Sequence, residues 1–323
     1  MQSVDFPEFK PHPWLANEHL QTVYASLLMP IRNPGYRREL ITTPDGDVIA
    51  ADWIDGPEDQ PMLVLIHGME GDSDSRYARL LMTECRNRSW RGVVLHMRSC
   101  GGLMNRKQTF YHAGYYEDIQ FFMDQVLPKR SLMSKPFLMG VSLGGSQVLH
   151  YLAKGKAKEN VRAGAVVSTP LDLRGSADFM IGGLNRIYVL KFRNSLVKKY
   201  KMKSHLIDNP QIVIDLAKAK NFWDLDNIAT APMHGFRDAN HYYDEMSSKN
   251  VLKDIQVPTV YLAAKDDPFI PEESMPETGY HFDNLQAYLT EAGGHVGFID
   301  NQHESWMVKA VFKYFTTIES KNS

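Results

Sequence analysis

Cysteine is scarce in this chain: only Cys85 and Cys100 occur among 323 residues. Two cysteines cannot build the disulfide framework of a small secreted protein, and both fall in stretches that we interpret as interior structure. The N-terminus lacks the basic segment followed by an apolar run that is typical of a secretory signal peptide. We therefore expect a protein of a reducing compartment, and predict the cytoplasm.

Long apolar runs and an excess of one charge are missing as well. No run of about 18 apolar residues occurs, so no membrane-spanning helix is expected, while a peripheral membrane contact is left open. The formal net charge is −2, which gives the chain no overall field to attract nucleic acid. Hydrophobic residues make up 43% and charged residues 23% of the chain, as in ordinary globular proteins.

The chain also lacks the motifs of the common cofactor sites. It has no G-x-G-x-x-G, no phosphate-binding loop, no H-E-x-x-H and no cysteine-pair spacing for zinc. We therefore expect neither a cofactor nor a bound metal ion. The sequence shows no internal repeat, and nothing in it indicates an oligomeric state.

Short apolar runs alternate with amphipathic segments over most of the chain. After a predicted hairpin at residues 39–54, buried strands are expected at 62–67, 92–97, 136–141, 162–168, 258–264 and 286–290. Helices are expected at 75–89, 114–127, 143–153 and 303–319. This alternation predicts an α/β fold with a mostly parallel central sheet and helices on both faces.

Residues 170–250 interrupt the alternation, because they read as mainly helical. We predict an N-terminal arm and the first part of the core at 1–169, a helical lid insertion at 170–250, and the rest of the core at 251–323. A basic stretch runs from Arg186 to Lys203 within the insertion. We interpret it as a solvated helix face, with a contact to lipid headgroups or to an acidic substrate as the alternative.

The motif with the clearest chemistry is Gly140-Val141-Ser142-Leu143-Gly144. It lies between a predicted buried strand and a predicted helix, which is the setting of a nucleophile elbow. Small residues are needed beside the serine because the turn is tight. The helix N-terminus then points at the serine oxygen. The alternative is a glycine-rich turn that contains a serine by chance.

A serine nucleophile needs a base, and the base needs an orienting acid. Asp266 and Asp267 follow the predicted strand at 258–264, and His295 follows the strand at 286–290. The order serine, acid, histidine is the one found with this type of elbow. We favour Asp267 as the acid because a short apolar segment ending in Pro271 follows it, while Asp266 is interpreted as a turn or cap residue.

An oxyanion hole also needs two backbone N–H groups. We assign these to Leu143, directly after Ser142, and to Met69 in the segment His67-Gly68-Met69-Glu70-Gly71 that follows the strand at 62–67. A second match to a serine motif, Ser195-Leu196-Val197-Lys198, lacks its partner motifs and lies in the basic stretch. We interpret that match as a coincidence.

Several segments together resemble the YheT-like branch of the α/β-hydrolases, which includes relatives of bacterial YheT, plant EMB8 and lipid esterases of yeast and animals. The similar segments are Asn17–Thr22, His67–Gly71 with Ser75–Ala78, Arg98–Gly102 with Asn105-Arg106, and Thr230–Phe236 with Tyr242-Tyr243. Glu18 stands where that branch usually has proline or another residue, and Ser99 where it usually has glycine; both departures concern loop shape. The likeness covers almost the whole chain and implies an α/β-hydrolase fold.

The resemblance also implies hydrolysis of carboxylic esters, with short- to medium-chain acyl esters or lipid esters as substrates. Acyl transfer to an alcohol occurs in the same branch and is the main alternative. A binding protein without catalytic activity on a hydrolase fold is a third interpretation. The presence of Ser142, Asp267 and His295 in the expected order favours an enzyme.

Overall fold

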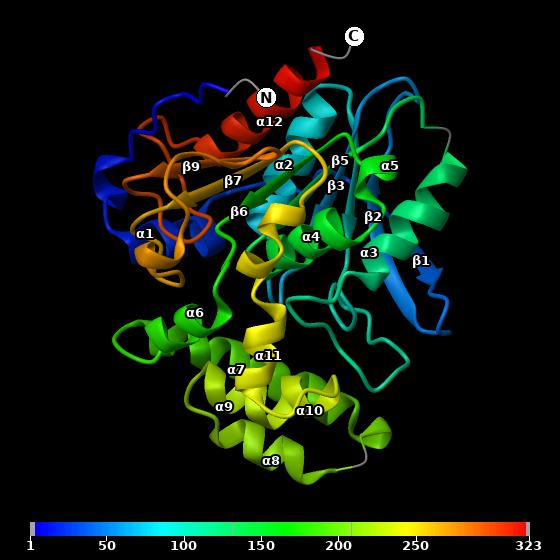
Figure 1. Ribbon diagram of the computed structural model, residues 1–323, viewed down its shortest axis with the longest axis vertical. Helices are drawn as coiled ribbons and strands as arrows, with labels where there is room; N and C mark the ends of the chain where they lie inside the picture. Colours follow the sequence, from blue (N-terminus) through cyan, green and yellow to red (C-terminus); the bar gives the residue numbers. More distant parts are fainter. Residues whose placement is uncertain (1–3, 131, 208, 321–323) are drawn as a thin grey trace.

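The computed structural model describes residues 4–130, 132–207 and 209–320, so the ends of the predicted N-terminal arm and C-terminal part (1–3 and 321–323) lie outside it. A nine-stranded sheet forms the centre of the molecule (Figure 1), in the order β1-β2-β4-β3-β5-β6-β7-β9-β8. The strands are β1 (Arg37–Thr42), β2 (Val48–Ile54), β3 (Met62–Ile66), β4 (Arg91–Leu95), β5 (Phe137–Val141), β6 (Ala163–Val167), β7 (Thr259–Ala264), β8 (Gly279–Phe282) and β9 (Leu285–Thr290).

The strands from β4 to β9 form the parallel part of the sheet. The pairs β4–β3, β3–β5, β5–β6, β6–β7 and β7–β9 are all parallel, and only β1, β2 and β8 run antiparallel to their neighbours. The predicted mostly parallel α/β sheet is therefore confirmed. The edge strand β8 was not predicted, because its four residues form no continuous apolar run.

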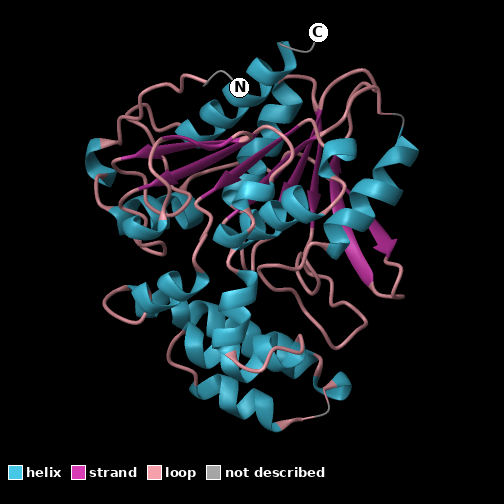
Figure 2. Ribbon diagram, in the orientation of Figure 1, coloured by secondary structure: helices cyan, strands magenta, loops and turns pink. Residues whose placement is uncertain are grey.

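Helices cover both faces of the sheet (Figure 2). Side chains alternate along β3: Leu63 and Leu65 pack in the same cluster as α2 and α12, while Val64 and Ile66 pack with α4. Burial on both faces explains why these strands are nearly continuous apolar runs. The core helices are α1 (Glu18–Val23), α2 (Arg76–Asn87), α3 (Glu117–Phe121), α4 (Leu143–Lys154), α5 (Ala157–Asn160) and α12 (Trp306–Ser320).

The chain between β6 and β7 forms a group of helices below the sheet in Figure 1. They are α6 (Leu173–Phe179), α7 (Asn185–Met202), α8 (Gln211–Lys218), α9 (Phe222–Leu225), α10 (Ala231–Met233) and α11 (Ala239–Met246), with a π-helical turn at Asp226–Thr230. We call residues 170–250 the insertion. None of the described helices is long and apolar enough to cross a bilayer.

The N-terminal arm is tied to the core by polar contacts. The Gln21 side chain donates a hydrogen bond to the Ile299 carbonyl (3.0 Å) and accepts one from the Ile299 N–H (2.8 Å). Gln21 is fully buried, so these bonds replace the water that its amide would otherwise bind. They hold α1 against the loop that follows β9.

Candidate active site

Ser142 lies on a strained turn between β5 and α4. Its backbone φ of 53° is in the left-handed region, which costs energy for any residue except glycine. A Cβ on Gly144 would lie 2.1 Å from the His67 carbonyl oxygen, and one on Gly145 would lie 1.9 Å from Thr169 Oγ1. Neighbouring backbone and side chains therefore leave no room for larger residues here, as the glycines of the motif predict.

His295 joins Ser142 to Asp267. Its Nε2 lies 2.9 Å from Ser142 Oγ, and its Nδ1 lies 2.9 Å and 3.1 Å from the two carboxylate oxygens of Asp267. Asp267 is 2% exposed, and one of its oxygens also accepts a hydrogen bond from the Phe269 N–H (2.8 Å). The structure thus brings together the three side chains that the sequence singled out, on turns that follow β5, β7 and β9.

The neighbouring carboxylate of Asp266 has a different contact. Its Oδ1 accepts a hydrogen bond from the Gly294 N–H (2.8 Å), in the loop just before His295. Burial raises the pKa of Asp266. Asp266 therefore braces the backbone of the histidine loop, while Asp267 contacts the imidazole itself.

Two further contacts hold His295, and the sequence did not point to either. The His295 N–H donates to Thr22 Oγ1 of the arm (2.9 Å), and the Phe269 ring stacks on the imidazole with centroids 4.1 Å apart. Thr22 belongs to the arm segment similar to the YheT-like branch, and Phe269 to the apolar segment after Asp267. These two segments were the only signals in the sequence that could have pointed to the contacts of Thr22 and Phe269 with His295.

The loop after β3 lies against the turn that carries Ser142. A Cβ on Gly68 would lie 3.2 Å from Ser142 Cβ, and the Gly68 N–H donates to the Tyr77 hydroxyl (2.8 Å). Met69 and Leu143 line the same cavity as Ser142. The two residues predicted to supply oxyanion N–H groups therefore both border the space in front of the serine.

Glu70, the next residue of this loop, joins it to helix α7. Its side chain is 7% exposed, and its carboxylate lies 2.6 Å from Lys199 Nζ and accepts a hydrogen bond from the Tyr111 hydroxyl (2.6 Å). Ser195 Oγ also donates to this carboxylate. A buried carboxylate needs such partners because burial removes its hydration.

These contacts change the interpretation of the basic stretch. Lys199 is 14% exposed at its side chain and faces Glu70, and Lys203 is buried, with Nζ 2.8 Å from Asn105 Oδ1. Burial lowers the pKa of Lys203 to about 8. The stretch is therefore not a uniformly solvated face. Ser195, the serine of the Ser195-Leu196-Val197-Lys198 match that we interpreted as a coincidence, contacts Glu70 and so has a structural role.

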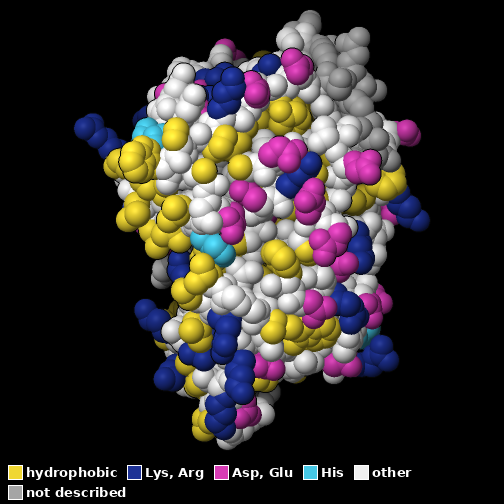
Figure 3. All heavy atoms as spheres, turned by 90° about the vertical axis from the view of Figure 1, so that its left-hand side faces the viewer, with side chains coloured by type: hydrophobic (Ala, Val, Ile, Leu, Met, Phe, Trp, Pro, Cys, Tyr) yellow, Lys and Arg dark blue, Asp and Glu magenta, His cyan; other side chains and the backbone are white. Residues whose placement is uncertain are grey.

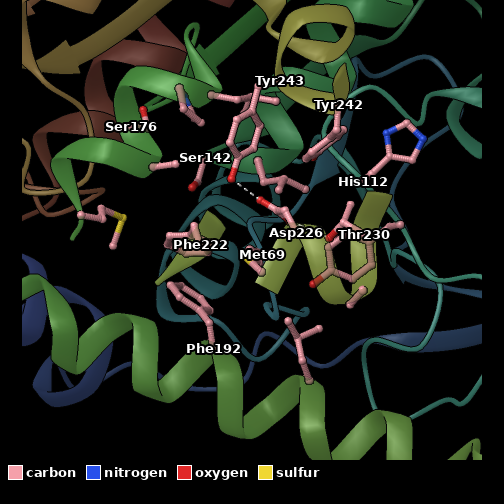
Figure 4. A pocket seen from close by; sticks show the side chains of 18 of the residues that line it. Met69, His112, Ser142, Ser176, Phe192, Phe222, Asp226, Thr230, Tyr242 and Tyr243 are labelled. Atoms are coloured by element: carbon pink, nitrogen blue, oxygen red, sulfur yellow. Dashed lines mark hydrogen bonds between the residues drawn. The ribbon is translucent and has the colours of Figure 1, made fainter. Parts of the chain in front are cut away.

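A cavity lies between the core and the insertion, with about 990 Å³ of atom-free space that is partly open to solvent. Its walls are mostly apolar and include Leu173, Met180 and Phe222 of the insertion, while Ser142 and His295 lie at its core side. Figure 4 shows Ser142 facing this space. An apolar cavity in front of a nucleophile suits an alkyl or aryl group better than a charged one.

One carboxyl group interrupts this apolar wall. Asp226 accepts hydrogen bonds from the hydroxyls of Tyr243 (2.6 Å) and Thr230 (2.6 Å), and Figure 4 shows the pair Asp226–Tyr243 at the cavity. Burial raises the pKa of Asp226 to about 6. Asp226 lines the cavity and is partly buried.

A second hollow reaches Ser142 from another direction. This groove is lined by the arm, by the loop after β3 and by α7, and it also borders Ser142 and His295. Leu27 of the arm and Ile187 of α7 are among its walls. Ser142 therefore lies where two hollows meet. Within the described part of the chain, no three His, Cys, Asp or Glu side chains gather so that they could hold a metal ion.

The sequence matches one family model and several curated proteins. The model, described as the alpha/beta hydrolase fold, matches residues 61–302. The chain is 32% identical to the proposed esterase YheT of Escherichia coli (strain K12), over 98% of this chain and 95% of that protein. It is 30% identical to phospholipase ABHD3 of Mus musculus (95% and 77%) and 28% identical to the monoacylglycerol lipase of Saccharomyces cerevisiae (90% and 66%).

Solved structures share the architecture. The Pyrococcus furiosus esterase Pf2001 superposes with a TM-score of 0.59 at 16% identity, over 97% of this chain and 99% of that one. A thermophilic esterase from Thermogutta terrifontis superposes with a TM-score of 0.54 at 15% identity, over 87% and 99%. At such low identity the likeness concerns the fold alone.

Proposed function

Because this chain belongs to the YheT-like branch of the α/β-hydrolase family, we propose that it is a serine hydrolase that cleaves carboxylic esters through an acyl-enzyme on Ser142. The observation that carries the proposal is the imidazole of His295, which contacts Ser142 Oγ through Nε2 and the Asp267 carboxylate through Nδ1. Nucleophile, base and orienting acid are thus in hydrogen-bond contact in the order that acyl transfer needs.

The reaction proceeds in two steps. Ser142 Oγ attacks the ester carbonyl carbon as its proton passes to His295 Nε2, and the carbonyl π electrons move onto oxygen. When the tetrahedral intermediate collapses, the C–O bond to the alcohol breaks and His295 returns the proton to the leaving oxygen. Water then attacks the acyl carbon, again losing its proton to His295, and the acid leaves as Ser142 regains a proton.

The remaining parts of the site act on charge and orientation. Asp267 keeps the Nδ1–H tautomer of His295 and stabilises the imidazolium that forms during each step. The N–H groups of Leu143 and Met69 stabilise the negative charge on the carbonyl oxygen. This assignment is supported by the position of both residues beside Ser142 on the cavity wall.

The two hollows suggest where the acyl and alcohol parts of an ester bind. The apolar cavity under the insertion suits the acyl chain, and the groove between arm and α7 suits the alcohol part, because each borders Ser142. We infer that the insertion is a lid over the acyl chain. The names of the relatives, an esterase, a phospholipase and a monoacylglycerol lipase, support acyl or lipid esters as the substrate class.

Acyl transfer to an alcohol is the second candidate. It uses the same acyl-enzyme, and the groove that reaches both Ser142 and His295 has room for an acceptor. Adding a small alcohol to a hydrolysis assay distinguishes the two reactions. A new ester at the expense of free acid supports transfer, whereas unchanged release of acid supports hydrolysis.

The proposal is tested with p-nitrophenyl esters of increasing acyl length. We expect hydrolysis by the native protein and a loss of roughly 10⁴-fold or more in kcat for Ser142→Ala. Ser146→Ala, on the same helix, removes only a hydrogen bond to the Pro170 carbonyl and is the matched control. Retained activity in Ser142→Ala, or equal loss in the control, would contradict the assignment.

A further inference from the structure

Large apolar side chains are exposed on two segments that are far apart in the sequence. One segment is the arm around α1, and the other runs from the end of α6 through the first two turns of α7. Their side chains are between 41% and 63% exposed; they are Leu20, Leu27, Leu28, Phe179, Ile181, Leu184, Ile187 and Leu190. We call this set the apolar rim. Large apolar side chains that are exposed close together usually mark a binding surface.

The two halves of the apolar rim meet at the groove that leads to Ser142. Leu27 and Ile187 both line this groove, and His19 Nδ1 of α1 lies 3.2 Å from the Tyr188 hydroxyl of α7. Figure 3 views the side of the molecule that carries the arm, and hydrophobic side chains gather along one edge of that face. The rim therefore borders an entrance to the candidate active site.

Positively charged side chains lie beside the part of the apolar rim that belongs to the insertion. Residues 179–207 contain seven Lys and Arg and no Asp or Glu, although the whole chain has a net charge of −2. Four of them are exposed, and no carboxylate of the described residues forms an ion pair with any of the four: Arg186, Lys191, Lys198 and Lys201. In Figure 3, Lys and Arg side chains gather at the lower end of the same face, in the insertion.

We propose that the apolar rim docks on an anionic lipid surface. Apolar side chains can enter the boundary between headgroups and acyl chains while Lys and Arg beside them reach the phosphates, and both contributions favour the same orientation. A second copy of the chain is a poorer occupant, because two-fold pairing of this face would bring the unpaired cations of both copies together. When the apolar rim is docked in this way, the groove opens toward the lipid. The use of the groove as an entrance for substrate rests on the proposed function, whereas the docking of the rim does not.

The test is cosedimentation with vesicles of phosphatidylcholine, alone or mixed with phosphatidylglycerol. The native protein and Ser142→Ala should bind the mixed vesicles equally, and binding should weaken as salt is added. Leu184→Asp and Leu28→Asp should each weaken binding by about tenfold, because a charge replaces an inserted apolar group. Arg186→Glu should weaken binding to the mixed vesicles and leave the weak binding to pure phosphatidylcholine nearly unchanged.

Matched controls lie elsewhere on the surface. Leu40 on the edge strand β1 is 59% exposed, against 58% for Leu184, so Leu40→Asp makes the same change outside the rim. Lys313→Glu, on α12, is the control for Arg186→Glu. Both controls should bind vesicles as the native protein does. Leu184→Asp should also keep its activity on a water-soluble short-chain ester, since Leu184 lines neither hollow.

Three results would overturn the proposal. They are no binding of the native protein to mixed vesicles, equal losses in Leu40→Asp and Leu184→Asp, and a dimer in solution that Leu184→Asp dissociates. The outcome is separable from that of the proposed function. Vesicle binding by an inactive native protein would refute ester hydrolysis alone, and hydrolysis of soluble esters without vesicle binding would refute docking alone.

Discussion

The sheet carries Ser142, Asp267 and His295 on turns that directly follow β5, β7 and β9, whereas the cavity in front of Ser142 is walled largely by the insertion. The first region is held by parallel strands that are buried on both faces. The second consists of short helices, of which only α7 exceeds eight residues. The groups proposed to react thus lie on turns of the buried sheet, and the surface proposed to select the substrate lies on a part that can vary without disturbing them.

Glu70 is one of the residues at which the two regions meet. It belongs to the loop that borders Ser142, and its carboxylate contacts Lys199 and Ser195 of α7. The position of the insertion is therefore linked to the backbone beside the proposed oxyanion donor Met69. The proposed catalytic region and the insertion can be tested separately, and this link between them can then be tested in turn.

The largest effect is expected within the sheet region. Asp267→Asn should lower kcat by roughly 10⁴-fold, because an amide favours the wrong tautomer of His295. Asp266→Asn is the matched change one residue away and should lower kcat by about tenfold or less, since its loss loosens only the Gly294 backbone. Steady-state kinetics on one soluble ester measure both. Equal losses, or a larger loss for Asp266→Asn, would reverse the assignment of the acid.

A smaller effect is expected at the link. Glu70→Gln should lower kcat by about tenfold with little change in KM, because a weaker hold on α7 and Tyr111 loosens the Met69 backbone in the transition state more than in the bound ester. Affinity for a boronic acid inhibitor, which forms a tetrahedral adduct on serine, should fall in parallel. A purely structural role of Glu70 would lower stability but leave this affinity unchanged.

Lys199→Met is the second half of this test. Alone it leaves the Glu70 carboxylate buried without its cation, but combined with Glu70→Gln it should add little further loss in kcat. Lys249→Met breaks another lysine–carboxylate pair, with Asp172 at the base of the insertion, and should leave kcat unchanged. Fully additive losses in the double variant would show that Glu70 and Lys199 act independently.

The smallest effect concerns stability of the insertion. Burial raises the pKa of Asp226 to about 6 from its ordinary value of 3.8, so ionising this group is harder in the folded than in the unfolded chain. The folded state then binds more protons between these pKa values, and stability falls as pH rises through that window. Asp226→Asn removes this cost and should raise the free energy of unfolding at about pH 8 by up to about 3 kcal/mol.

Urea unfolding at several pH values checks this prediction. The advantage of Asp226→Asn should shrink as pH falls from about 6 and disappear below 3.8, where the native carboxyl becomes protonated in both states. Asp244→Asn changes an exposed carboxylate of α11 and should show no such trend. An advantage of Asp226→Asn that is the same at all pH values would contradict the linkage.

The sequence predicted the sheet region well because its signals are local. Continuous apolar runs located the strands from Met62 to Val167 to within one or two residues, and Gly140 to Gly145 identified the turn at Ser142. The order of Asp267 and His295 along the chain then pointed to side chains that the structure places in contact. Each of these inferences depends on residues next to one another, or on strand ends that a parallel sheet must bring together.

The insertion was predicted less well because its contacts are long-range. Ser195 is 125 positions from Glu70, and nothing near either residue signals the contact. Lys199 and Lys203 were grouped with exposed lysines because helix α7 presents positive charge on several sides and sequence alone does not tell which side is buried. Thr22, 273 positions from His295, was missed for the same reason.

Labelling with a fluorophosphonate tests whether Ser142 is the residue that takes the acyl group. This reagent phosphonylates an activated serine, and mass spectrometry of the digested protein locates the adduct. We expect one adduct per chain, on the peptide with Ser142, with complete loss of ester hydrolysis, no labelling of Ser142→Ala and slow labelling of His295→Ala. An adduct at another serine, such as Ser195, or hydrolysis that persists in fully labelled protein, would contradict the claim.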